Sequence, residues 1–210
     1  MNGLVHPHLE RIDRAIDALR AERRRLSDAA PSVAYQGAPG AFSEDASRAL
    51  AGDDAVLHPL NTLDDVFQAL SLGVTEFAVI PVENTLVGAV PRAAELIRRH
   101  GCRVMAEHSL RIAHALIGCP GSTIEGIRRV ASHSVALAQC RQFFAERPNI
   151  CEVSAFDTAG AVAAAVTVAD PAGAAIGSTR AASLYGGQIL LSEIQDRRDN
   201  FTRFVVVAKG

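Results

Sequence analysis

Short apolar runs alternate with amphipathic segments along most of this chain, from about residue 33 to residue 208. The runs are rich in Val, Ile and Ala, which is typical of buried strands. The segments between them space their apolar residues by three and four, as helices do. Because strand and helix alternate at short intervals, the pattern predicts βαβ units with helices on both faces of a sheet. We therefore expect an α/β fold.

The same pattern gives approximate boundaries. The expected strands are 33–36, 55–58, 77–82, 103–107, 110–117, 128–131, 150–154, 174–176, 188–191 and 203–207. The expected helices are 42–51, 63–72, 87–100, 134–146, 158–168 and 178–184. These are too many strands for one small sheet, so we expect two lobes, each with a mainly parallel sheet.

A separate helix is expected before the first strand. Residues 9–27 place apolar side chains at helical spacing among Glu, Asp and Arg, which predicts an amphipathic helix. Residues 29–32 read as a short linker. We therefore expect an N-terminal segment of residues 1–31, followed by the α/β domain at 32–210. The apolar stripe of the helix needs a surface to cover it.

Composition excludes several classes of protein. With 49% hydrophobic and 21% charged residues in 210, the chain can bury a sizeable core, so intrinsic disorder is excluded. A formal net charge of -2 and few aromatic residues give no footprint for nucleic acid. No apolar stretch is long enough to span a bilayer, and no signal peptide pattern is present. We expect a cytoplasmic protein with neither a membrane nor a nucleic-acid partner.

The cysteines do not suggest a metal site or disulfides. The chain has four, Cys102, Cys119, Cys140 and Cys151, and none forms a C-x-x-C pair. We expect reduced core thiols and no metal ligands.

Polar residues lead directly into the last apolar run. Thr202 and Arg203 precede Phe204 and a run of valines that reads as a buried strand. Side chains alternate along an extended segment, so Thr202 and Phe204 are expected on one face and Arg203 on the other. A hydroxyl and a guanidinium at the mouth of a strand are candidates to meet a ligand, although isolated residues of these types are usually ordinary strand ends.

Other candidate residues follow the ends of earlier strands, where open parallel sheets bind ligands. Gly37 and Ala38 open a glycine-rich turn whose backbone N–H groups could bind a carboxylate, or which only makes a tight turn. Glu83 and Asn84 follow the strand ending at residue 82, and Asn84 could instead cap a helix. Ser132 follows a later strand, with Gln139 along the next helix.

Four separated blocks carry a resemblance to a known family. They are Tyr35 to Ser43, Pro81 to Thr85, Ser132-His133 with Ala138-Gln139-Cys140, and Asn200 to Phe204. Together and in this order they resemble the prephenate dehydratase family, across nearly the whole chain from Val33 to Ala208. Ala41 and Ser134 depart from the family pattern, which usually has Thr and Pro there.

The resemblance implies a fold like the type II periplasmic binding proteins. Lobe one would hold 32–108 and 198–210, and lobe two 109–197. It implies conversion of prephenate, a small anionic substrate, to phenylpyruvate without a cofactor. On the matching positions, the expected catalytic residues are Thr202, Glu83 and Asn84. The expected substrate-binding residues are Ser132, Gln139, Arg203, Gly37, Ala38 and Phe42. His114 and His133 are expected to be structural.

Several alternatives and consequences stay open. The substrate could be arogenate, or the chain could be a two-lobed ligand-binding protein without activity. A serine hydrolase is disfavoured because no G-x-S-x-G motif occurs. Family members commonly form dimers and continue into a regulatory ACT domain that binds phenylalanine. We therefore expect a homodimer. If residue 210 is the natural end, we expect no inhibition by phenylalanine at a separate site.

Overall fold

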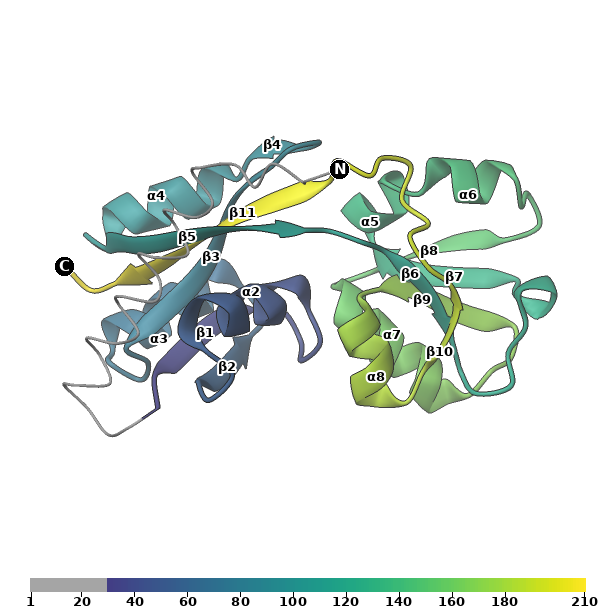
Figure 1. Cartoon of the computed structure of the whole chain (residues 1–210), viewed down its shortest axis with the longest axis horizontal. Helices are drawn as coiled ribbons and strands as arrows, with labels where there is room; N and C mark the ends of the chain where they lie inside the picture. Colours follow the sequence, from purple (N-terminus) through teal and green to yellow (C-terminus); the bar gives the residue numbers. More distant parts are fainter. Residues whose placement is uncertain (1–29) are drawn as a thin grey trace, which may run out of the picture. The chain divides into compact units, whose positions relative to one another are not determined.

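The computed structural model describes residues 30–210, so the helix predicted for 9–27 lies outside the described residues. The described chain forms two compact units (Figure 1). The first contains 30–36, Ser43–Leu110 and Thr202–Gly210, and the second contains Gly37–Phe42 and Arg111–Phe201. The lobes predicted from the sequence changed at 108 and 197, whereas the units change at 110 and 201 and place the glycine-rich turn in the second unit.

The first unit is a mixed sheet with helices on both sides. Its strands are β1 (Ser32–Gln36), β2 (Val56–Leu60), β3 (Phe77–Asn84), β4 (Gly88–Ala89), β5 (Arg103–Arg111) and β11 (Phe201–Ala208). Its helices are α2 (Phe42–Ala51), α3 (Leu63–Ser71) and α4 (Pro91–Arg99). The strand order is β2-β1-β3-β11-β5, with β4 beside β3. The first three strands are parallel, while β11 and β4 run antiparallel to β3.

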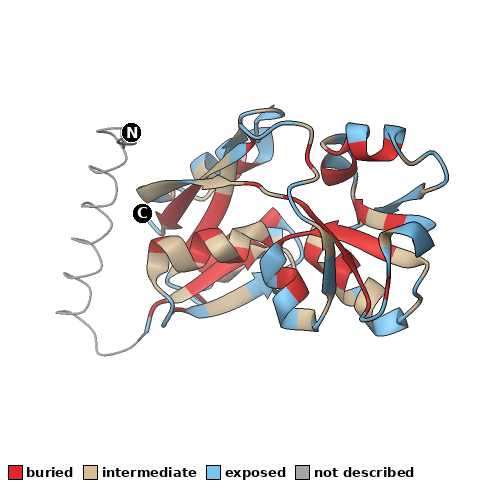
Figure 2. Ribbon diagram, turned by 45° about the vertical axis from the view of Figure 1, so that its right-hand side comes forward, coloured by how far each residue is buried: buried red, intermediate tan, exposed pale blue. Residues whose placement is uncertain are grey.

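Alternating side chains build two cores on this sheet. Val79 of β3 and Val206 of β11 lie opposite each other and pack with the buried residues of α2. Their neighbours Ile80 and Val205 pack with α3 and α4 on the other face. Figure 2 shows the resulting buried strands and inward helix faces. The period of two along β11 therefore fixes which of its residues faces which helix layer.

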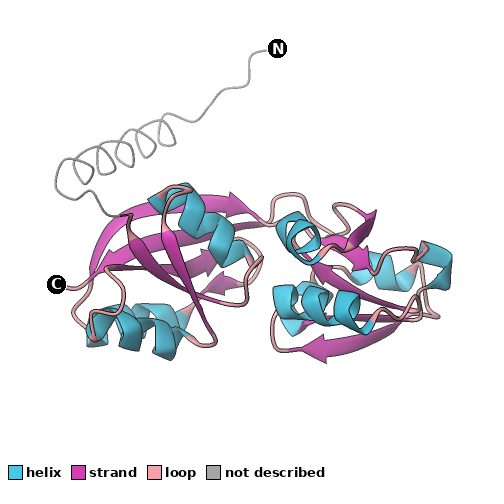
Figure 3. Cartoon of the chain, turned by 90° about the horizontal axis from the view of Figure 1, so that it is seen from below, coloured by secondary structure: helices cyan, strands magenta, loops and turns pink. Residues whose placement is uncertain are grey.

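The second unit repeats this architecture (Figure 3). Its strands are β6 (Ala115–Gly118), β7 (Arg129–His133), β8 (Cys151–Ala155), β9 (Gly173–Gly177) and β10 (Gln188–Leu191). Its helices are α5 (Ser134–Ala138), α6 (Arg141–Ala145), α7 (Thr158–Val168), α8 (Thr179–Tyr185) and the 3₁₀ turn η1 (Ile124–Gly126). The order is β10-β6-β9-β7-β8, with β7, β8 and β9 parallel and β6 and β10 antiparallel to their neighbours.

The α/β class with two units predicted from the sequence is confirmed, and each sheet combines a parallel group of strands with antiparallel ones. Alternation of strand and helix predicts the parallel part. It does not predict the direction of β11, which enters the first sheet after the whole second unit.

Several predicted boundaries also differ. The helix predicted for 87–100 begins only at Pro91, because residues 88–89 form β4, and the strand predicted for 110–117 is divided between the end of β5 and β6. The strand predicted for 77–82 continues to Asn84, because β4 and β11 pair with its end. The helix predicted for 134–146 is two short helices, α5 and α6, interrupted at Gln139 and Cys140. Asp196 stabilises the break: its backbone N–H donates to the Gln139 carbonyl, and its carboxylate accepts from the N–H groups of Arg141 and Gln142.

The four cysteines are free, as expected, but they are not all core residues. Cys119 and Cys140 are buried, Cys102 is half-buried and Cys151 is exposed on the edge strand β8. Burial raises the pKa of the Cys140 thiol to about 12, which keeps it protonated and unreactive. Among residues 30–210, no helix has both the length and the apolar character needed to cross a bilayer.

Candidate functional site

Thr202 and Asn84 meet across the strand pair β3–β11. They lie directly opposite each other in the register. The Asn84 Nδ2 atom donates to Thr202 Oγ1 at 2.9 Å, and both residues are half-buried. This direct bond joins residues 118 positions apart in the chain, and it brings together two of the three residues predicted to be catalytic.

The orientation of the Asn84 amide is fixed by its own turn. Its Oδ1 atom accepts from the backbone N–H of Leu86 at 2.9 Å and of Val87 at 3.1 Å. The oxygen can only accept, so the nitrogen must face Thr202. The Thr202 oxygen is therefore the acceptor in this pair, and the bond to Asn84 does not use its own proton. Such a hydroxyl is suited to donate to an oxygen of a ligand.

An irregularity in β3 decides which residue lies opposite Thr202. The register shifts between Arg203 and Phe204, because Arg203 pairs with Glu83 while Phe204 pairs with Pro81. Val82 is the extra residue of this bulge. Proline has no N–H to give to a ladder and is found in strand interiors mainly at such bulges. With regular pairing, Glu83 would lie opposite Thr202 instead of Asn84.

Glu83 and Arg203 form a separate charged group. Arg203 donates to the Glu83 carboxylate at 3.0 Å and to the Glu107 carboxylate of β5 at 3.2 Å. The hydrogen bond to Glu83 raises the pKa of Arg203, so the guanidinium is charged. All three side chains are 41% or more exposed. Because directly opposite residues share a face, Glu83 and Arg203 lie on the other face of the strands from Asn84 and Thr202.

The predicted glycine-rich turn is anchored within the second unit. Gly40 has a φ of +88°, and a Cβ there would lie 2.8 Å from the Ala181 backbone, so only glycine fits. The Ser178 hydroxyl donates to the Gly40 carbonyl at 2.6 Å, and the Tyr185 hydroxyl donates to the Pro39 carbonyl at 2.9 Å. These contacts fix the path of Gly37 and Ala38 and lead the chain to Phe42.

Gln139 lies at the break between α5 and α6, where two donors meet its side-chain oxygen. Asn200 Nδ2 donates to Gln139 Oε1 at 3.0 Å, and His114 Nε2 lies 2.9 Å from the same oxygen. The Phe42 ring packs edge-on against the His114 ring, with centroids 5.6 Å apart. The second unit therefore links two predicted substrate-binding residues, Phe42 and Gln139, through a histidine that the sequence analysis assigned to structure.

Ser132 is engaged inside the sheet. It is fully buried in β7, and its hydroxyl donates to the Ile176 carbonyl of β9 at 2.7 Å. The hydroxyl proton is thus used between neighbouring strands, and the structure gives Ser132 no bond to Gln139. The cap of α5 is the His133 ring, whose Nδ1 accepts from the Val135 N–H at 3.3 Å.

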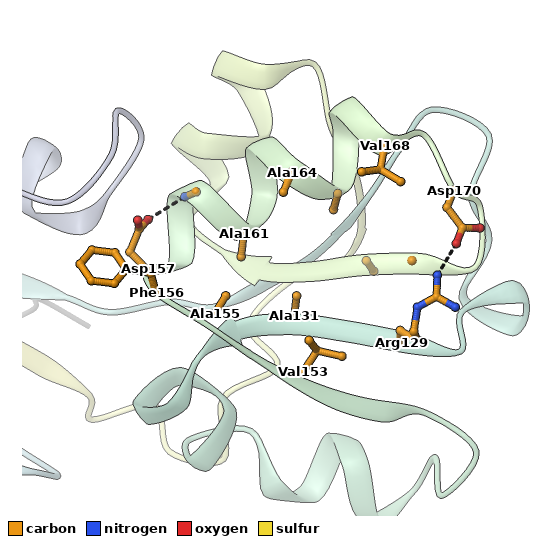
Figure 4. Close-up of a pocket in the computed structure, with 14 residues that line it drawn as sticks. Arg129, Ala131, Val153, Ala155, Phe156, Asp157, Ala161, Ala164, Val168 and Asp170 are labelled. Carbon is orange, nitrogen blue, oxygen red and sulfur yellow. Dashed lines mark hydrogen bonds and ion pairs between the residues drawn. The ribbon is translucent and has the colours of Figure 1, made fainter. Parts of the chain in front are cut away.

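A shallow hollow of about 420 Å³ lies elsewhere in the second unit, between α7 and the sheet (Figure 4). Its lining is mostly alanine and valine, with an Arg129–Asp170 ion pair at one end. None of the predicted site residues lines it. An apolar hollow without convergent polar groups has no means of polarising a small anionic substrate, so it is not the candidate site.

The sequence analysis did not single out Asn200 or Asp196 as partners of Gln139, and it did not foresee the contact between His114 and Gln139. Asn200 stands in one of the motif blocks, which was the available signal, but its bond to Gln139 spans 61 positions. Asp196 lies in the polar run before Thr202 and had no signal of its own. These contacts depend on where the segment before β11 passes α5, which local periodicity does not show.

A comparison with protein families matches residues 33–210 to the model described as "PDT: Prephenate dehydratase". The chain belongs to the prephenate dehydratase family. The match covers both units and every residue predicted for the site.

Known relatives of the family are similar to this chain in sequence and structure. Arogenate dehydratase 1 of Petunia hybrida is 42% identical over 181 residues, which cover 84% of this chain and 42% of the relative. A solved prephenate dehydratase from Arthrobacter aurescens, in complex with L-Phe, has a TM-score of 0.78 at 29% identity, covering 85% of this chain and 60% of that one.

A third similar protein carries a different description. The solved structure of GqqA, described as a novel type of quorum quenching acylase, has a TM-score of 0.77 at 35% identity and covers 85% of this chain and 64% of that one. The chain thus spans less than half the length of the plant relative and under two thirds of each solved one.

Proposed function

We propose that this chain catalyses the decarboxylating dehydration of prephenate to phenylpyruvate. The observation that carries the proposal is the Asn84–Thr202 pair, in which the amide fixes the hydroxyl as an acceptor and leaves its proton for a ligand oxygen. Family membership supplies the reaction class. The chemistry needs a donor for a departing hydroxyl, and this pair provides one.

The reaction balances without an external oxidant or reductant. The bond from the ring to its carboxylate breaks and releases carbon dioxide, and its electron pair enters the ring. The ring carbon–oxygen bond then breaks, and the leaving oxygen accepts a proton to become water. Aromatisation supplies the driving force, so the protein has to orient the substrate and stabilise the leaving oxygen. Thr202 is the proposed donor, either by a hydrogen bond to the leaving oxygen or by transfer of its proton, which solvent water then replaces on Thr202.

The remaining residues are proposed to bind the substrate. The Gln139 oxygen is occupied by the side chains of His114 and Asn200, and its amide nitrogen has no partner among residues 30–210, so we expect that nitrogen to donate to the substrate. Arg203 is charged but is already bonded to Glu83 and Glu107, so its role as a carboxylate ligand stays a prediction. So do the roles of Glu83, Ser132 and the turn at Gly37 and Ala38.

Arogenate is the alternative substrate. It carries an amine where prephenate has the side-chain keto group, and the Petunia relative bears the name of an arogenate dehydratase. The proposed donor acts on the ring hydroxyl, which both compounds share. The Asn84–Thr202 pair therefore serves either substrate, and the choice depends on groups that contact the side chain.

An acylase is the second candidate, on the name of one similar structure. An acylase requires a nucleophile activated by a base, or an activated water. Thr202 accepts a hydrogen bond from an amide, and the Ser132 hydroxyl donates to a backbone carbonyl. In the part of the chain that the structure describes, neither hydroxyl is bonded to a base, which favours dehydration.

The test is turnover by the purified chain with prephenate, arogenate and an N-acylated amine in separate reactions. We expect phenylpyruvate from the first or phenylalanine from the second. Thr202→Val should lower kcat by roughly a hundredfold or more, since it removes the donor, while Thr202→Ser should retain much of the rate. Binding of either acid without turnover would support a ligand-binding protein, and release of the amine an acylase.

A further inference from the structure

Three buried polar side chains of the second unit form a hydrogen-bonded cluster with the half-buried Gln139. His114 is 2% exposed, Gln195 6% and Asn200 0%. The His114 backbone N–H donates to Gln195 Oε1 at 2.8 Å, and the side chains of His114 and Asn200 both reach Gln139 Oε1. Buried hydrogen bonds of this kind specify a geometry, although two buried atoms of the cluster, His114 Nδ1 and Gln195 Nε2, have no partner among the described residues. Here the geometry specified is that of Gln139.

The direction of these bonds assigns the protons. Asn200 donates its amide hydrogen to Gln139 Oε1, so this atom is the acceptor. A carbonyl oxygen cannot donate, and His114 must therefore carry a proton on Nε2 and donate it at 2.9 Å. Two donors occupy the oxygen of Gln139. The plane and sense of the carboxamide are fixed as a result, with both N–H bonds of Nε2 left for other acceptors.

The surroundings of the ring keep His114 neutral. The Nδ1 atom is buried and has no hydrogen-bond partner among the described residues. Phe42 packs edge-on against the ring, and within residues 30–210 no charged side chain is bonded to it. Burial lowers the pKa of His114, in agreement with this geometry. A neutral ring with its proton on Nε2 is a fixed donor rather than a group that exchanges protons with a substrate.

We propose that His114 is a positioning residue: with Asn200 it holds the Gln139 carboxamide so that its N–H groups donate to an oxygen of the anionic substrate. This inference rests on the proposed function for the substrate. It differs from the sequence-based expectation, in which His114 had only a structural role. The edge of Phe42 against the ring keeps the donor in line with Gln139.

Three substitutions of His114 distinguish the effect of losing its N–H donor from the effect of losing the volume of its ring. His114→Phe keeps a ring against Phe42 but removes the donor. His114→Gln places an amide N–H near the position of Nε2, whereas His114→Asn reaches only as far as Nδ1. We expect kcat/KM to fall about tenfold to a hundredfold in the Phe and Asn variants, mainly through KM, and to recover most of that loss in the Gln variant.

Two controls make the comparison specific. His100→Phe changes a half-buried histidine of the first unit, bonded to Ser71 Oγ at 2.8 Å, and should leave kcat/KM within about twofold of the parent. The double variant His114→Phe with Gln139→Ala should be no slower than Gln139→Ala alone, because both changes remove one function. The proposal would be overturned if the reductions in kcat/KM of the two single variants multiplied in the double variant. It would also be overturned if His114→Gln were as slow as His114→Phe.

A measurement without substrate separates this inference from the proposed function. Long-range ¹H–¹⁵N NMR of the parent should show His114 protonated on Nε2 and bare on Nδ1 at neutral pH. The Gln139 side-chain amide signals should shift in the Phe variant and return toward the parent in the Gln variant. If the parent turns over neither acid, the proposed function fails, but the spectra still test the contact between His114 and Gln139. Protonation of His114 on Nδ1, or Gln139 signals that do not shift in the Phe variant, would contradict the role of His114.

Discussion

The direction of a single hydrogen bond gives Thr202 its proposed role. A threonine hydroxyl is a very weak acid and has no preferred partner of its own. Asn84 sets that preference, and Asn84 is itself oriented by two backbone N–H groups of its turn. The chemistry therefore depends on the amide at position 84 as much as on the hydroxyl at 202.

This dependence predicts the effect of Asn84→Asp. The carboxylate can still accept from Leu86 and Val87, so the turn should persist. Its second oxygen can only accept, and the Thr202 proton would then point to Asp instead of to a ligand. We expect kcat to fall by roughly a hundredfold, as for Thr202→Val. Steady-state kinetics measure the rate, and circular dichroism and the urea midpoint serve as controls for the fold. A rate within a few-fold of the parent would argue against the proposed direction of the bond.

Burial of His114 predicts how stability depends on pH. Its pKa is lowered in the folded state by burial, while the unfolded chain has the ordinary value of about 6.5. As the pH falls through that value, the unfolded state binds a proton first. The free energy of unfolding is therefore unaffected by His114 above about pH 6.5. It declines as the pH falls from there toward the folded pKa, by at most about 1.4 kcal/mol per pH unit.

The matched variant is His114→Phe, which has no group to titrate. Urea unfolding at a series of pH values should give the parent a steeper fall in unfolding free energy on acidification than the Phe variant. Carboxylates common to both proteins cancel in the difference between the two slopes. Parallel pH dependences would show that His114 titrates normally.

At the scale of elements, a remote carboxylate makes the break between α5 and α6. Asp196 accepts from Arg141 N and Gln142 N, at 2.9 Å each, across 55 and 54 positions. Side-chain caps of this kind are worth about 0.5–2 kcal/mol. The break places Gln139 at the end of α5, so the cap is also part of how the candidate site is built.

We therefore expect Asp196→Ala to lower the free energy of unfolding by about 1 kcal/mol. Asp196→Asn should lose about half as much, because one of its two acceptor atoms remains. The control is Asp199→Ala, which removes an exposed pair with Arg197 and should change stability by no more than about 0.5 kcal/mol. Urea denaturation measures all three, and equal effects at 196 and 199 would exclude a special role for the cap.

Most elements could be predicted from the sequence, because apolar periodicity is local. Strand ends near Thr202 and helices such as α3, with its Thr62 cap, lie close to where the pattern puts them. Two features of the candidate site could not be predicted. The bulge at Val82 exchanges Glu83 for Asn84 opposite Thr202, and the break at Gln139 needs Asp196. Both depend on register between distant segments, which no window of residues contains.

At the scale of the whole molecule, the self-association predicted from the sequence stays a prediction. The helix predicted for residues 9–27 would have an apolar stripe that needs a surface to cover it, and the resemblance implies a dimer. We expect light scattering at micromolar concentration to give twice the mass of one chain. Deletion of residues 1–28 tests whether this segment is the contact. A monomeric parent would contradict the prediction, and a dimeric deletion variant would place the contact within residues 29–210.

The position of β11 has a consequence for biosynthesis. This strand lies between β3 and β5, yet it follows the entire second unit along the chain. During synthesis, the second unit can fold as soon as residue 201 has left the ribosome. The first sheet at that point still lacks the strand between β3 and β5. Until β11 arrives, the facing edges of β3 and β5 present unpaired backbone groups, the kind of surface on which nascent chains associate wrongly. The ribosome therefore delivers the proposed donor, Thr202, on the strand that completes the first sheet.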